Sequence, residues 1–147
     1  MSRQIGRDRG PAPGDDVRLN AGRRVAELRP EEPARFNPDK LEELCSRIGE
    51  ARAEREVALA LDRIAATLQV LPRIADDGNP AVLRAGIVSL VRDADLIGMA
   101  TLSRVARSVV ICLDTGDRQA FAATIARLGR VGDRSIHAVW ELEDLSG

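Results

Sequence analysis

The chain has 147 residues, 44% of them hydrophobic and 31% charged, which suffices for one domain with its own core and is too short for two domains of ordinary size. Its 22 basic and 23 acidic residues give a net charge of −1 and are interleaved, so we expect neither nucleic acid nor a membrane as a partner, although every basic residue except Lys40 is arginine. Two Phe, one Trp and no Tyr require an aliphatic core, and the abundant Ala, Leu, Arg and Glu favour an all-α fold.

The sequence shows no sign of export or membrane insertion. No run of about 18 uncharged apolar residues occurs, and the N-terminus lacks the apolar segment of a signal peptide. We therefore expect a cytoplasmic protein in which Cys45 and Cys112 are reduced and act as small buried hydrophobic residues.

Residues 1–35 differ in composition from the rest of the chain. Glycine and proline stand among charged residues, and such a segment buries too little apolar area to offset its ordering entropy. We predict a mostly disordered tail, in which four apolar residues could form a short amphipathic helix that ends before Pro30, with docking on the bundle or on a partner as one alternative. Its apolar residues are Val17, Leu19, Val25 and Leu28.

Residues 36–147 are predicted to form the folded domain. Asn37 suits the N-cap and Pro38 the first position of a short helix, which stops or kinks at Gly49. A long helix follows, with apolar residues at spacings of four, three, four and three; Pro72 does not end it, and the turn before Pro80 does. The buried residues expected in these two helices are Leu41, Leu44, Ile48, Val57, Leu61, Ile64, Leu68 and Leu71.

Residues 80–117 are predicted to form a helical hairpin with a break at Ile97-Gly98. The stripe of the first helix is Leu83, Ile87, Leu90, Ala94 and Ile97. That of the second is Leu102, Val105, Ala106, Val109, Cys112 and Leu113. Gly116 suits the left-handed residue after a helix, and Asp117 can cap the next one.

The last apolar pattern predicts either one bent helix or two helices, with Gly129 and Gly132 as kink points. Altogether we expect an antiparallel four-helix bundle with an additional short N-terminal helix. Its core is predicted to contain Leu61, Ile64, Leu68, Leu83, Ile87, Leu90, Leu102, Val105, Val109, Ile125 and Leu128.

Residues 36–143 resemble the histidine-containing phosphotransfer (Hpt) domain, a helical bundle that relays phosphoryl groups between receiver domains in two-component signalling. The opening FNPDKLEELCSRIG matches the start of that family. The family signature has a Leu, five residues later the phospho-accepting His, and then x-L-K-G-S-A-x-x-L-G-A-x-x-L. Counting forward from Leu83 and back from Gly98 both place that His at Val88.

The match covers the apolar and glycine positions of the signature, whereas the positions that take part in phosphoryl transfer differ. Leu90, Ala94, Ile97, Gly98 and Leu102 fit the signature. The positions of the family's His, Lys, Gly and following small residue are instead occupied by Val88, Val91, Arg92 and Asp93. Valine has no lone pair to attack an aspartyl phosphate, so the resemblance implies a degenerate, Hpt-like domain that does not carry phosphate at this site.

Other candidate residues point to no chemistry. His137 stands without a neighbouring ligand or base, and Asp93 and Asp95, two apart on a helix, do not face each other. Trp140 suits either a partner anchor or, as we predict from its spacing with Ile136, packing in the core or at the bundle end. Because no metal-ligand spacing, phosphate loop or nucleophile–base pair occurs, we expect no enzymatic activity, metal or cofactor.

The resulting hypothesis is a protein-interaction module that docks a receiver domain or histidine kinase without carrying phosphate. The partner-binding face is predicted on the helix from Pro80, opposite its buried stripe, with exposed valines among charges. Its residues are Arg84, Val88, Val91, Arg92 and Asp95. The alternatives are that the bundle buries both valines, or that they meet their copies in a self-associating homodimer unrelated to phosphorelay.

Overall fold

The computed structural model of the protein describes residues 34–146, so the short helix expected within residues 1–35 lies outside the described residues. The described part is all-α, as predicted, and contains five helices. They are α2 (Pro38–Ile48), α3 (Glu50–Asp77), α4 (Pro80–Leu96), α5 (Ala100–Thr115) and α6 (Arg118–Ser146).

The helices begin and end where the sequence predicts. The side chain of Asn37 accepts a hydrogen bond from the amide of Asp39, and Asn79 accepts from Ala81 and Val82, so each caps a helix that starts with proline. Helix α5 ends at Gly116, in the left-handed conformation. Helix α3 continues through Pro72, as expected.

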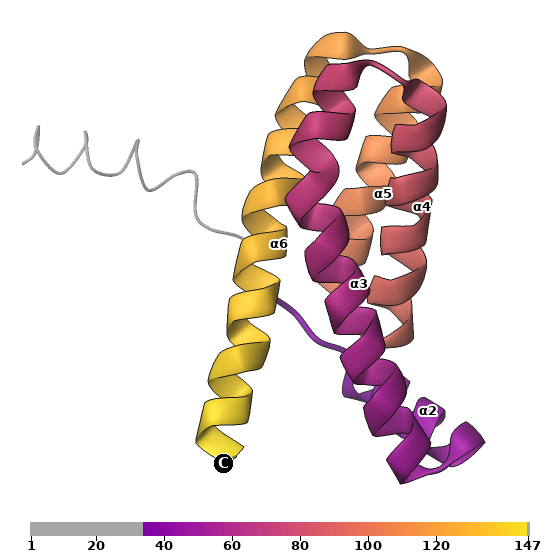
Figure 1. Cartoon of the computed structure of the whole chain (residues 1–147), viewed down its shortest axis with the longest axis vertical. Helices are drawn as coiled ribbons and strands as arrows, with labels where there is room; N and C mark the ends of the chain where they lie inside the picture. The colour runs from indigo at the N-terminus through magenta and orange to yellow at the C-terminus, as the bar shows by residue number, and fades with distance from the viewer. Residues whose placement is uncertain (1–33, 147) are drawn as a thin grey trace, which may run out of the picture. The chain divides into compact units, whose positions relative to one another are not determined.

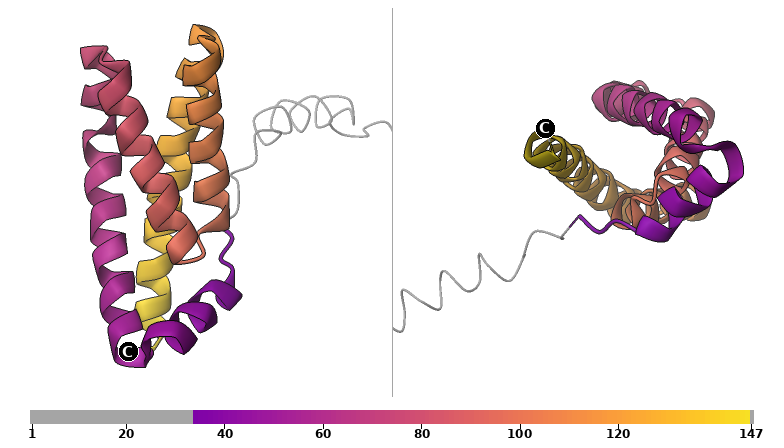
Figure 2. Two further views of the ribbon diagram at one scale, coloured as in Figure 1. Left: turned by 90° about the vertical axis from the view of Figure 1, so that its right-hand side faces the viewer. Right: turned by 90° about the horizontal axis from the view of Figure 1, so that it is seen from below.

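Helices α3 to α6 run alternately up and down side by side, and α2 lies across the lower end of this bundle (Figures 1 and 2). Within residues 34–146 there is no β-strand, only an isolated bridge between Phe36 and Met99. No helix in that range is long and apolar enough to cross a membrane.

One aliphatic core joins the four long helices. Ile64, Ile87, Leu90 and Leu128 are fully buried in it, and the other residues predicted for the core are either buried there or packed against it. The short helix α2 behaves differently, because only Leu44 is buried in it. The prediction that Leu41 is buried is wrong, since its side chain is exposed.

The break between α4 and α5 is held by the residues that open the domain. Gly98 has a φ of 77°, and a Cβ atom there would overlap the carbonyl oxygen of Asn37. The amide of Asn37 donates to the Gly98 carbonyl at 2.7 Å, and the amide of Ala100 donates to the carbonyl of Arg35 at 3.0 Å. The start of the domain and the hairpin break therefore form one unit.

Helix α6 is a single helix, which resolves the alternative left open by the sequence. Gly132 does not interrupt it. A Cβ at Gly132 would lie 2.6 Å from Cδ1 of Leu68, so the missing side chain lets α6 approach α3 closely at this point. Toward Glu50 and Ser146 the two helices diverge (Figures 1 and 2).

Candidate functional site

The position that maps to the family's histidine lies on the outer side of α4. Leu83, Ile87 and Leu90 point into the core, and one helix face buried in this way turns Val88 outward. The Val88 side chain is 40% exposed. Val91 is half-buried and packs against the core, so the alternative that the bundle covers the valines holds only for Val91, and there only in part.

Val88 and Val91 line a shallow apolar hollow between α4 and α5. Val110 and Ile111 form its other wall, Arg107 lies at its edge, and its volume is about 290 Å³. Ile111 is 61% exposed. We call this feature the α4–α5 hollow.

Sequence reasoning missed the half of the hollow that belongs to α5. Ile111 falls outside the buried stripe of α5, which includes Val105 and Val109. An isoleucine outside a helix's buried stripe was a usable signal. Which apolar residue it would lie beside depends on how α4 and α5 pack, and the sequence does not show this.

A salt bridge spans α4 and α5. Arg84 Nε donates to Asp114 Oδ1 at 2.9 Å, and Nη2 donates to Oδ2 at 3.2 Å. These hydrogen bonds lower the pKa of Asp114 and raise the pKa of Arg84. Arg84, which was predicted for the partner-binding face, is therefore already paired within the molecule.

A second polar group ties the lower part of α4 to α5. The hydroxyl of Ser103 donates to Asp95, and Arg107 donates both to Asp95 and to Ser103. Asp95 is half-buried and shares both of these partners. It holds Arg107 at the edge of the α4–α5 hollow.

Arg92 lies away from the hollow. It lines a cleft on the other flank of α4, which α2 and α3 complete and which Asp95 also lines. The five residues predicted for partner binding are thus divided between two sides of α4, with Val88 and Val91 together and Arg92 apart from them.

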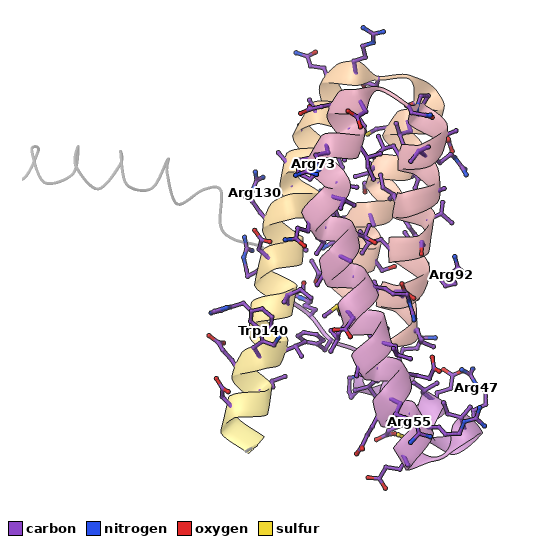
Figure 3. The ribbon with its side chains drawn as sticks, viewed as in Figure 1. Arg47, Arg55, Arg73, Arg92, Arg130 and Trp140 are labelled. Carbon is purple, nitrogen blue, oxygen red and sulfur yellow. The ribbon has the colours of Figure 1, made fainter. Side chains whose placement is uncertain are left out.

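The remaining candidates gather on α6. Ile136, His137 and Trp140 line a hollow of about 340 Å³ with residues of α3, and His137 Nε2 lies 3.6 Å from Glu141 Oε1. Trp140 is 58% exposed, so the prediction that it packs in the core or at the bundle end is wrong. The reason is the divergence of α3 and α6, which leaves the end of α6 uncovered (Figure 3).

Cys45 and Cys112 are free thiols and only half-buried, so the prediction that both are buried is wrong. Cys112 Sγ lies 3.6 Å from Thr124 Oγ1. Among the described residues, no group of three or more His, Cys, Asp or Glu side chains is arranged to hold a metal ion.

The α4–α5 hollow is suited to contact rather than to chemistry. Four of its five side chains are hydrocarbons, which have neither a proton nor an electron pair to transfer. Exposed aliphatic side chains beside an arginine are typical of a small protein interface. In such an interface the apolar side chains are buried against the partner, and charged side chains surround them.

No family model matches the sequence, and the searches of curated proteins and of solved structures give no match either.

Proposed function

We propose that this protein is a non-catalytic, Hpt-like interaction module that docks a receiver domain or histidine kinase of two-component signalling through the α4–α5 hollow, without carrying phosphate. The observation that carries the proposal is the position of Val88. The residue that the resemblance maps to the phospho-accepting histidine lines the apolar hollow and is exposed there. A docking surface retained without its nucleophile would have this composition.

A second observation supports the resemblance on which the partner class depends. Two residues that were matched to the family in separate motifs, Asn37 in the opening segment and Gly98 in the signature, contact each other. Only glycine fits beside the Asn37 carbonyl in this conformation. The two matches are therefore linked by a structural requirement.

The test is a binding and transfer experiment with purified receiver and histidine kinase domains encoded near the gene for this chain. We expect at least one of them to form a complex with the wild-type protein by calorimetry. With a radiolabelled phosphoryl receiver we expect no acid-labile label on this chain, because Val88 has no lone pair for transfer.

Two results contradict the proposal. If none of these domains binds, the partner class is wrong. If acid-labile label appears on the wild-type chain and is absent from His137→Ala, the chain carries phosphate on its only imidazole.

The alternative is a self-associating structural bundle. It is favoured by Val88 and Ile111 lining one hollow, where a two-fold axis would pair them with their copies. Sedimentation of the wild-type protein distinguishes the two functions. A dimer that dissociates in Ile111→Glu, together with no binding of receiver or kinase domains, supports the alternative.

A further inference from the structure

The cleft on the other flank of α4 contains a concentration of basic side chains. It has a volume of about 440 Å³, and Lys40 and Arg47 of α2, Arg63 of α3 and Arg92 of α4 all line it. Three helices that are separate in sequence thus bring four cations to one concave site.

Arg63 is fixed in place by a buried carboxylate. Its Nε donates to both carboxylate oxygens of Asp93, at 3.2 and 3.1 Å, and its Nη2 donates to Oδ1 at 2.9 Å. Asp93 is only 6% exposed. The hydrogen bonds to Asp93 raise the pKa of Arg63. They leave both N–H groups of Nη1 without a partner on Asp93, so the guanidinium is oriented and still has donors to offer.

Among the other charged side chains that line the cleft, some are paired with an opposite charge and two arginines are not. Lys40 Nζ lies 3.6 Å from Glu43 Oε2, and Asp95 is paired with Arg107. Arg47 and Arg92 make no ion pair with any residue that the structure describes. Both extend from the same side of the molecule, Arg92 above Arg47 (Figure 3). After all pairs are formed, two positive charges remain.

We propose that this cleft binds the phosphate group of a small organic phosphate monoester, held by Arg47, Arg92 and Nη1 of Arg63. A phosphate monoester carries a charge of about −1.5 to −2 at neutral pH, which matches the two unpaired arginines. Guanidinium groups recognise phosphate oxygens through paired N–H donors. The hydroxyl of Ser89 also lines the cleft and can donate to the same group.

The size and walls of the cleft indicate an organic ligand rather than the bare ion. Its volume falls in the range of about 300 to 1,000 Å³ typical of small-molecule sites. Leu96 lines it as well, is half-buried, and supplies apolar surface beside the cations. This proposal does not rest on the docking function, because it uses the other flank of α4.

The experiment is a calorimetric titration of the full chain with inorganic phosphate and with phenyl phosphate, at constant ionic strength maintained with chloride. We expect saturable one-to-one binding, with phenyl phosphate tighter than inorganic phosphate because its ring can contact Leu96. Arg47→Gln and Arg92→Gln should each weaken binding about tenfold or more, since each removes a charge-assisted hydrogen bond.

Arg73→Gln and Arg130→Gln are matched controls, because both arginines are exposed and lie outside the cleft (Figure 3). They should leave binding unchanged. Equal weakening by all four variants would show only a general effect of net charge and would overturn the site. The site would also be overturned if neither inorganic phosphate nor phenyl phosphate bound saturably below about 10 mM. Equal affinity for the two probes would overturn the organic class of the ligand.

Discussion

At the scale of single residues, Val88 and the Arg63–Asp93 pair illustrate two kinds of position, one on the outer side of a helix and one that joins two helices. Counting from Leu83 and from Gly98 placed the family's histidine position at Val88, and the Val88 side chain is exposed in the structure. The pairing of Asp93 with Arg63 was not foreseen. The two residues are 30 positions apart, and only the packing of α3 on α4 brings them together. Local patterns carry no such information.

Gly98 provides a residue-scale test of the hairpin break. Gly98→Ala should destabilise the protein by at least about 1–2 kcal/mol, because its φ of 77° disfavours a Cβ and that Cβ would overlap Asn37. Gly86→Ala is the control: it lies inside α4 with open space around a Cβ, and it should stabilise by about 0.5–1 kcal/mol. Urea unfolding measures both, and a Gly98→Ala protein as stable as wild type would contradict the proposed constraint.

The Arg84–Asp114 salt bridge predicts a pH effect. Because the hydrogen bonds from Arg84 hold the pKa of Asp114 below its ordinary value of 3.8, the pair stabilises the fold above that pH. The contribution is lost as the pH falls through the lowered pKa. Carbon NMR of the Asp114 carboxyl should therefore show a higher pKa in Arg84→Gln and no change in Arg73→Gln. An unaltered titration in Arg84→Gln would mean that the bridge does not form in solution.

At the scale of elements, helix boundaries were predictable and helix environments less so. Asn37, Asn79 and Gly116 act locally, and each ends or begins a helix as expected. Gly132 was predicted as a kink point because glycine is a weak helix former, whereas its role is close contact with Leu68. That role belongs to the α3–α6 contact, which is invisible from one helix alone.

The buried and exposed faces of helix α4 differ in what they contribute to stability. Leu90→Ala should cost about 2 to 5 kcal/mol, because Leu90 is fully buried and its truncation leaves a cavity. Val82→Ala, on an exposed residue of the same helix, should stay within about 0.5 kcal/mol. Thermal unfolding tests both, and similar melting midpoints for Leu90→Ala and wild type would show that the assignment of the core face is incorrect.

At the scale of the whole molecule, an aliphatic all-α fold followed from composition and periodicity, since every stripe needs another stripe to cover it. What did not follow is the arrangement of uncovered surfaces. The exposure of Trp140 results from the divergence of α3 and α6, and the cationic cleft results from α2 lying across the bundle end. Both depend on helix packing angles, which apolar spacing does not specify.

At the same scale, α4 lines two hollows of different composition. The α4–α5 hollow is apolar and includes Val88, and the cleft on the opposite flank is basic and includes Arg92. A docked protein and a bound phosphate ester would therefore lie on different sides of one helix. Val88→Glu should therefore leave phosphate binding intact, and Arg92→Gln should leave binding of the protein partner intact.

The α4–α5 hollow is the surface that we propose binds the protein partner. The most direct measurement is the calorimetric affinity of the receiver or kinase domain for Val88→Glu and Ile111→Glu, with Val82→Glu as control. Val82 is 51% exposed on the same helix and lies outside the hollow.

A carboxylate buried in the contact without a partner costs several kcal/mol, so the two hollow variants should bind at least tenfold more weakly. Val82→Glu should bind as the wild type does, and all three should melt near the wild-type midpoint. Folded Val88→Glu and Ile111→Glu proteins that bind the partner with wild-type affinity would show that the partner does not dock at the α4–α5 hollow.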